Sequence, residues 1–239
     1  SLNGDWSSLQ PDDNVITPFE GLQQIAPKGV EFEYFNSGEQ IKKIKDEDIK
    51  TAAAKAAKSD LAIVYVGENS MRYNWPEKTN GENKGRANIN LSGKQLNLVK
   101  AIHATGTPVV VILISGRPLA TPWIDRNIPA VLNAWEPGNF GGQAIAEILY
   151  GKVNPSGKLP ISIPRSVGQI QTIYNHKPSQ YFHKYTFDNA EKPSFIIDLG
   201  LAINWDKVTT SSLKLANENR ITGTRFSTGW AKNQKVFFV

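Results

Sequence analysis

The chain has 239 residues, no cysteine and a net charge of +5. This length suffices for one large domain or two small ones, and the lack of cysteine excludes disulfides and thiolate metal sites. The longest apolar runs have six residues, so no segment approaches the roughly 20 apolar residues of a membrane-spanning helix.

The first half of the chain alternates helical and extended patterns. Residues 18–25 are expected to form a short helix and residues 30–35 a strand. Residues 46–58 are rich in alanine and begin with acidic side chains, which favour a helix start because they interact well with the helix dipole. Residues 61–66 form a continuous apolar run that predicts a buried strand.

The same alternation continues after a long polar loop at residues 67–92. A helix is predicted over residues 93–104, a strand over 109–114, a short helix over 118–126 and a strand over 130–134. A further helix, with Ile145 and Leu149 on its apolar face, is expected to end at Gly151. Residues 159–163 alternate apolar and polar, but Pro160 and Pro164 lack backbone donors, so this segment predicts an edge strand.

Strands that are apolar almost throughout and alternate with helices predict a parallel sheet that is covered on both faces. The expected fold is therefore doubly wound α/β, with a mostly parallel sheet of about five to six strands. Open sheets of this kind bind ligands at the carboxyl ends of their strands, so the loop at residues 67–92 is the first place to look for chemistry.

Several dispersed motifs occur together in one order along the chain. They are Ile114-Ser115-Gly116-Arg117-Pro118-Leu119, the stretch of residues 134–165 from Ala-Trp-Glu-Pro-Gly to Leu-Pro-Ile-Ser-Ile-Pro-Arg, the segment Arg165-Ser166-Val167-Gly168-Gln169-Ile170, and Tyr174-Asn175-His176-Lys177-Pro178. Together they resemble the C-terminal α/β sandwich domain of glycoside hydrolase family 3, the β-glucosidases and exo-β-glucanases. The likeness runs from about Gly4 to about Lys177 and implies that fold.

Both ends of the chain depart from the family pattern. The family's sandwich normally opens with a strand before a Gly-x-Trp motif, but here Gly4-Asp5-Trp6 stands at the start, so we expect that strand to be missing. The family's Phe-Gly-Tyr-Gly-Leu-Ser reads Ile197-Asp198-Leu199-Gly200-Leu201-Ala202. We therefore expect a sandwich domain at residues 1–206 of a fragment, and a basic, poorly ordered tail at residues 207–239.

The tail also explains the charge of the chain. Six basic residues and one acidic residue from Lys207 onward account for the whole excess, so residues 1–206 are neutral. A solvated tail is the simpler interpretation, and no specific nucleic-acid partner and no membrane partner are expected.

The long loop contains three carboxylates, Glu68, Glu77 and Glu82. The stretch Gly81-Glu82-Asn83-Lys84-Gly85-Arg86 resembles the part of the family that carries the general acid/base glutamate, which implies this catalytic role for Glu82. The alternative is a solvated loop carboxylate. Glu68, directly after a predicted strand, is expected to be a structural hydrogen-bond acceptor, and Glu77 to be exposed.

Two tryptophans are candidates for substrate binding. Trp6 matches the tryptophan of the family's Gly-x-Trp motif, which implies an aromatic platform for a sugar ring, and its alternative role is to anchor the N-terminal segment. Trp75 lies on the same loop as Glu82 and could also face sugar, although an exposed aromatic residue needs no explanation. The three histidines lack ligand-like spacing, so no metal and no other cofactor is expected.

A retaining glycosidase needs two carboxylates, a nucleophile and an acid/base. In the resembled family the nucleophilic aspartate belongs to an N-terminal barrel domain that this sequence does not contain. The resemblance therefore implies a domain that supplies the acid/base and part of the aglycone subsite for β-linked glucosides or gluco-oligosaccharides, and that is inactive by itself. The alternative is a non-catalytic carbohydrate-binding or interaction module. The family suggests a periplasmic or extracellular parent enzyme, although the chain shows no signal peptide.

Overall fold

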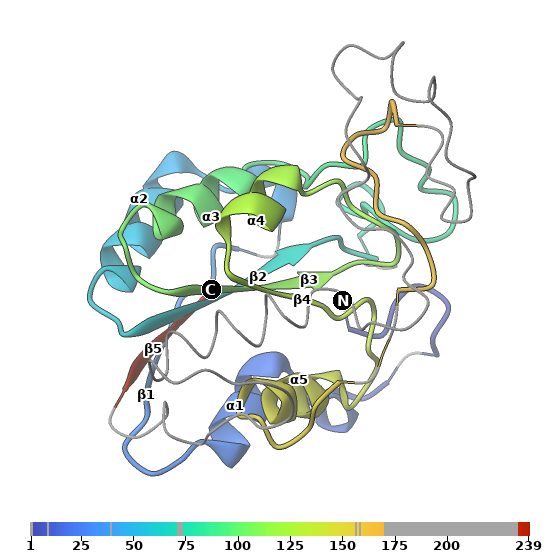
Figure 1. Ribbon diagram of the computed structural model, residues 1–239. Coiled ribbons are helices and arrows are strands. Elements are labelled where there is room, and N and C mark those ends of the chain that lie inside the picture. Colours follow the sequence, from blue (N-terminus) through green and yellow to red (C-terminus); the bar gives the residue numbers. More distant parts are fainter. Residues whose placement is uncertain are drawn as a thin grey trace, which may run out of the picture.

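Within the residues that the structure describes, the centre of the molecule is a parallel sheet of five strands in the order β1-β5-β2-β3-β4 (Figure 1). The computed structural model describes residues 2–8, 10–38, 40–70, 74–155, 157, 159–169 and 234–239. The strands are β1 (Glu31–Tyr34), β2 (Leu61–Gly67), β3 (Val109–Ile114), β4 (Ala130–Asn133) and β5 (Lys235–Phe238). The expected, mostly parallel sheet of about five to six strands is confirmed.

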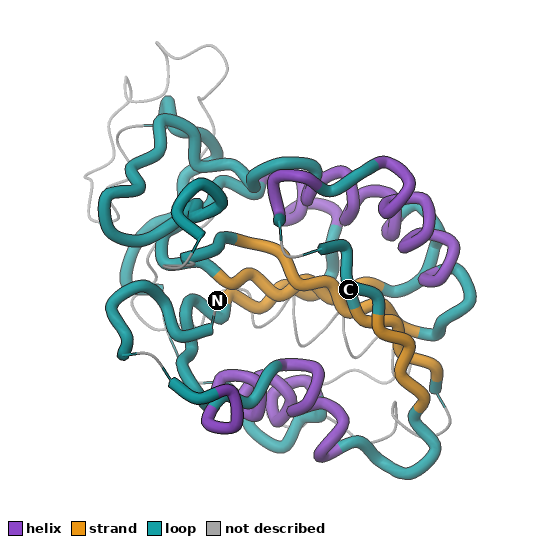
Figure 2. The backbone as a smooth tube through the Cα atoms, turned by 180° about the vertical axis from the view of Figure 1, so that it is seen from behind, coloured by secondary structure: helices purple, strands orange, loops and turns teal. Residues whose placement is uncertain are grey.

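Helices cover both faces of this sheet (Figures 1 and 2). One face carries α2 (Asp46–Ala56), α3 (Gln95–His103) and α4 (Pro122–Asn127), and the other carries α1 (Pro18–Ile25) and α5 (Gly141–Leu149). The short 3-10 helices η1 (Asp12–Asn14) and η2 (Ile41–Lys43) lie in the connections. The doubly wound α/β architecture predicted from the alternating pattern is therefore present.

The alternation of side chains along β3 shows why its run of apolar residues needs two covering layers. Val109, Val111 and Leu113 are buried in the core beneath α2, α3 and α4. The intervening Val110 and Ile112 are buried in the second core, against α1 and α5. Successive side chains of a strand point to opposite faces, so a fully apolar strand is stable only between two layers.

The start of α1 follows from its local sequence. The Thr17 hydroxyl accepts a hydrogen bond from the backbone N–H of Glu20, and the Glu20 carboxylate accepts one from the backbone N–H of Thr17. Pro18 occupies the first turn, where no backbone donor is needed. The predicted bounds of this helix agree with the structure.

The last residues of the chain belong to the middle of the sheet. β5 lies between β1 and β2 and is parallel to both, and the Phe237 side chain is fully buried. The segment predicted as a basic tail at residues 207–239 thus ends in a core strand. Residues 207–233 lie outside the described residues, so the division at residue 206 stays a prediction.

The strand predicted at residues 159–163 is not formed. Leu159 and Ile163 are buried, but the described part of this segment contains only an isolated bridge at Ile163. Pro160 and Pro164 remove the donors that a ladder would need, which explains the difference. The stretches at residues 174–178 and 197–202 lie outside the described residues. Among the described helices, none is long and apolar enough to cross a membrane.

Candidate functional site

The carboxyl ends of β2, β3 and β4 bring polar side chains together at one edge of the sheet. Glu68 follows β2, Ser115 and Arg117 follow β3, and Glu136 comes shortly after β4. Parallel strands place their carboxyl ends side by side, so residues far apart in sequence become neighbours there. This is the edge at which the sequence predicts chemistry.

Glu68 is the centre of a buried ionic network. Its side chain is fully buried and pairs with Arg86 (Nη1–Oε1, 2.7 Å) and with Arg117 (Nε–Oε2, 3.0 Å). The Ser115 hydroxyl donates a third bond to Oε2 at 2.8 Å. A buried carboxylate is stable only when it is paired and hydrogen-bonded, and this one is. The expectation that Glu68 is a structural acceptor at a strand end is confirmed.

A second buried ion pair joins the N-terminal turn (residues 3–7) to the loop that carries Glu82. The Asp5 carboxylate accepts hydrogen bonds at Oδ2 from Lys78 Nζ at 2.7 Å and from the backbone N–H of Glu82 at 2.6 Å. Lys78 Nζ also donates to the carbonyl of Glu82 at 3.1 Å. Asp5 and Lys78 together therefore hold the backbone of Glu82 through both its N–H and its carbonyl.

The Glu82 side chain itself is exposed. The residues that follow it in the loop are bonded to other parts of the protein. Arg86 is held by Glu68 and by the carbonyl of Asn90, and the Lys84 carbonyl accepts a hydrogen bond from Arg117 at 2.7 Å. The loop is thus attached to the sheet edge around Glu82 and leaves the carboxylate facing outward. Its assignment as the general acid/base stays a prediction.

The expectation that Glu77 is simply exposed was wrong. Its side chain is only 12% exposed and pairs with Lys43, Nζ to Oε1, at 3.3 Å. The loop folds back over η2, where Lys42 Nζ donates to the carbonyl of Pro76. This contact covers the Glu77 side chain.

Trp75 is 48% exposed and interacts with two lysines of its own loop. Lys78 Nζ lies 4.5 Å from the ring centroid and Lys84 Nζ lies 5.1 Å from it. These distances are typical of cation–π contacts. Trp75 does not line the pocket described next, and its role in sugar binding stays a prediction.

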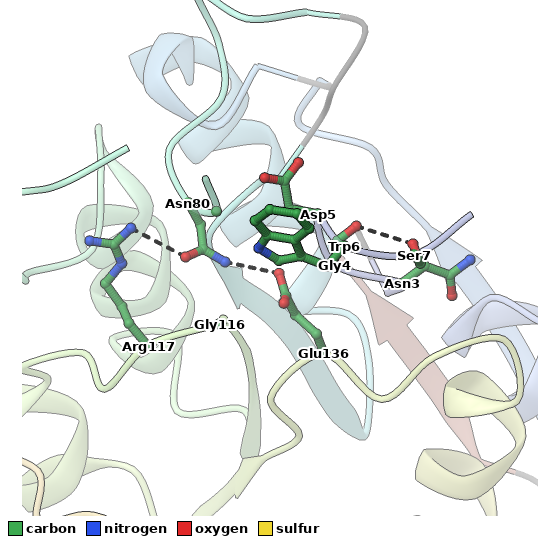
Figure 3. A pocket seen from close by; sticks show the side chains of 10 residues that line it. Asn3, Gly4, Asp5, Trp6, Ser7, Asn80, Gly116, Arg117 and Glu136 are labelled. Atoms are coloured by element: carbon green, nitrogen blue, oxygen red, sulfur yellow. Dashed lines mark hydrogen bonds between the residues drawn. The ribbon is translucent and has the colours of Figure 1, made fainter. Parts of the chain in front are cut away.

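Trp6 lines a pocket of about 550 Å³ beside the Glu82 loop (Figure 3). The walls come from the N-terminal turn, the 67–92 loop and the ends of β3 and β4; they comprise Asn3, Gly4, Asp5, Trp6, Ser7, Asn80, Gly81, Gly116, Arg117 and Glu136. Trp6 is 76% exposed, so its indole presents a large apolar surface to this opening. An aromatic face beside polar side chains is a common composition of small-molecule sites.

The polar side of the pocket is a line of three side chains. Arg117 Nη2 donates to Asn80 Oδ1 at 3.2 Å, and Asn80 Nδ2 donates to Glu136 Oε1 at 2.9 Å (Figure 3). Sequence reasoning missed Asp5, Asn80 and Glu136. Only Glu136 carried a signal, since it follows a predicted strand at the edge where such sheets bind ligands.

No group of three or more His, Cys, Asp or Glu side chains that could hold a metal ion occurs within the described ranges. His103 packs edge-on against Trp123, with ring centroids 5.6 Å apart. His176 and His183 lie outside the described residues.

The sequence model of the glycosyl hydrolase family 3 C-terminal domain matches residues 1–203. A shorter match, to the glycosyl hydrolase family 92 N-terminal domain, covers residues 181–239. A β-xylosidase of Formosa agariphila is 34% identical over 240 residues, which cover 93% of this chain and 32% of the relative. A periplasmic β-glucosidase of Salmonella typhimurium is 32% identical over 263 residues, 97% of this chain and 33% of the relative.

Solved structures agree with these sequence matches. A β-glucosidase from Listeria innocua in complex with gluconolactone superposes with a TM-score of 0.70 at 26% identity, over 85% of this chain and 28% of that one. A β-glucosidase from Erythrobacter marinus gives a TM-score of 0.66 at 31% identity, over 84% and 30%. This chain spans about a third of the length of the relatives it matches. Because the family match covers most of the chain, the protein belongs to glycoside hydrolase family 3 and corresponds to its C-terminal domain.

Proposed function

We propose that this domain supplies the general acid/base and part of the aglycone subsite of a retaining β-glucosidase or exo-β-glucanase. Glu82 is the acid/base, Trp6 and Trp75 contact the sugar, and the nucleophile comes from a barrel domain outside this sequence. The substrates are β-linked glucosides or gluco-oligosaccharides, and the parent enzyme is periplasmic or extracellular.

The observation that carries this proposal is the attachment of Glu82 beside the pocket. Its backbone is bonded to Asp5 and Lys78 while its carboxylate remains exposed. An acid/base has to protonate an oxygen that arrives with the substrate, so it needs a fixed backbone and an accessible carboxylate. Trp6, next to Asp5 in sequence, faces the same pocket.

A chimera tests this function. The whole 239-residue chain, which includes the core strand β5, would replace the matching segment of the Salmonella typhimurium relative, and kcat would be measured on β-glucosides with good and poor leaving groups. Glu82→Gln should lower kcat by about 10²- to 10⁴-fold on the poor leaving group, which requires a proton, and by less on the activated one. Glu77→Gln in the same loop is the matched control.

Two results would contradict the proposal. One is a Glu82→Gln chimera that retains full activity on the poor leaving group. The other is release of glucose from an aryl β-glucoside by the isolated 239-residue chain, above the level of its own Glu82→Gln variant. The second result would show a complete site within this chain, whereas a retaining site requires two carboxylates.

A carbohydrate-binding module is the second candidate function, and the 76% exposure of Trp6 beside the pocket favours it. Calorimetric titration with gluco-oligosaccharides separates the two functions. Binding that is lost in Trp6→Ala, together with a chimera that does not depend on Glu82, would support the module alone.

A further inference from the structure

We propose that Glu136 is a hydroxyl-binding residue of the pocket, and that it makes the pocket select neutral pyranosides over acidic ones. The inference rests on the proposed function, because it names the sugar class taken by the same site. Glu136 belongs to none of the segments that sequence reasoning assigned to catalysis or binding.

The backbone before Glu136 adopts a conformation that is unfavourable for its residue. Trp135 has φ of +54°, in the left-handed region that bulky side chains rarely occupy. Such a conformation is unfavourable for a residue with a side chain and persists only where the surroundings hold it. Here the Trp135 carbonyl accepts the backbone N–H of Ser115 at 3.2 Å. The turn therefore fixes the chain at the point where Glu136 lines the pocket.

The Glu136 carboxylate is held at one oxygen, and the described residues offer no partner to the other. Oε1 accepts the hydrogen bond from Asn80, and Arg117 in turn orients Asn80. Within the described part of the chain, Oε2 has no hydrogen-bond partner. Glu136 lines the pocket, and a carboxylate oxygen without a partner can accept a hydrogen bond from a ligand.

Two glycines from separate segments leave the space that this carboxylate occupies. A Cβ at Gly4 would lie 2.5 Å from Oε2, and one at Gly116 would lie 3.0 Å from the same atom and 2.4 Å from Asn80 Nδ2. Any side chain at either position would displace the carboxylate or the amide. The N-terminal turn and the end of β3 thus both fit around Glu136.

The chemistry of these groups indicates the ligand. Glu136 only accepts hydrogen bonds, Asn80 has a second N–H to donate, and Trp6 offers an aromatic face in the same pocket (Figure 3). A pyranoside matches this set, since adjacent hydroxyls can both donate and accept while the C–H face of the ring packs on the indole. A uronic acid would bring a second negative charge to Glu136 and be disfavoured.

The test compares two sugars on the intact 239-residue chain. Methyl β-glucoside and methyl β-glucuronide are titrated while the Trp6 indole N–H resonance is followed by NMR, with Trp6→Phe to assign it. The wild-type chain should bind the glucoside about tenfold more tightly than the glucuronide. In Glu136→Gln, which keeps the size of the side chain, the ratio of the two affinities should fall toward one because the glucoside binds more weakly.

The ratio distinguishes recognition from simple damage to the pocket. Damage to the pocket would weaken the binding of both sugars equally, so an unchanged ratio of the two affinities in Glu136→Gln overturns the inference. A wild-type chain that prefers the glucuronide overturns it as well. Failure of the wild-type chain to bind either sugar also overturns it. That outcome leaves the proposed function separately testable, because the Glu82 dependence of the chimera does not rely on binding by the isolated chain. Glu47 is an exposed residue of α2 that does not line the pocket, so Glu47→Gln should leave this ratio at its wild-type value.

Discussion

Replacement of Asp5 by asparagine should release the loop that carries Glu82. The side chains of Asp5 and Lys78 are 4% and 1% exposed, so the change leaves a buried ammonium group without its counter-charge. Removing one partner of a buried ion pair typically costs about 3 to 5 kcal/mol. Asparagine still offers an oxygen to the N–H of Glu82, so we expect about 3 kcal/mol, the low end of this range.

Native-state hydrogen exchange measures this loss at the residue concerned. A reduction of about 3 kcal/mol in the free energy of local opening should speed exchange of the Glu82 amide by about 100-fold. Asp13→Asn, which changes an exposed aspartate of η1, is the matched control and should leave this amide unchanged.

A second variant isolates the charge. In Asp5→Asn/Lys78→Met the buried ammonium is gone, so about tenfold or more of the lost protection should return. Exchange of the Glu82 amide in Asp5→Asn that stays within threefold of wild type would refute the reasoning. So would a double variant that is no better protected than the single one.

Three further predictions concern the core, the pH dependence and the pocket. Phe237→Ala, at a fully buried position of β5, should lower the free energy of unfolding in urea by about 3 to 5 kcal/mol, whereas Phe140→Ala at an exposed position should not change it measurably. Hydrogen bonds from Lys235 and Lys55 lower the pKa of Glu33 from 4.5 to about 2, so this carboxylate stabilises the fold above pH 4.5 and loses its effect as the pH falls through 2. Chemical denaturation from pH 7 to pH 2 should therefore show a smaller loss of stability in Glu33→Gln than in wild type, and an equal loss would contradict this sign. Trp6→Ala should abolish the sugar-induced NMR shifts of pocket residues without changing the melting temperature, and retained shifts would exclude Trp6 as a sugar platform.

Most of the fold could be predicted because its signals are local. α1 begins with a proline and a capping pair, and β3 is a continuous apolar run whose bounds agree with the structure. Family motifs around Arg117 and residues 134–165 identified the domain. Two segments were exceptions. Residues 159–163 form no strand because the prolines outweighed the alternating pattern, and β5 lies at the end of a segment predicted as a tail.

The site was only partly predictable. The sequence placed Glu82 and Trp6 as candidates by resemblance, but it could not show that Asp5 contacts both Lys78 and the Glu82 backbone across more than 70 positions. Likewise Asn80 and Glu136 are 56 positions apart and meet through one hydrogen bond. Such contacts depend on how the loops close over the sheet edge, and no local pattern encodes that.

The sequence by itself determined the class of fold, the family and the loop that holds the acid/base candidate, because periodicity and dispersed motifs are properties of short segments. The tertiary structure alone decided that residues 235–238 lie between β1 and β2 and that Glu136 shares a pocket with Trp6. The physical reason is that the order of the strands depends on burying the apolar residues on both faces of the sheet. Helices and strands from distant parts of the chain bury these residues together, so no single segment determines which strand ends become neighbours.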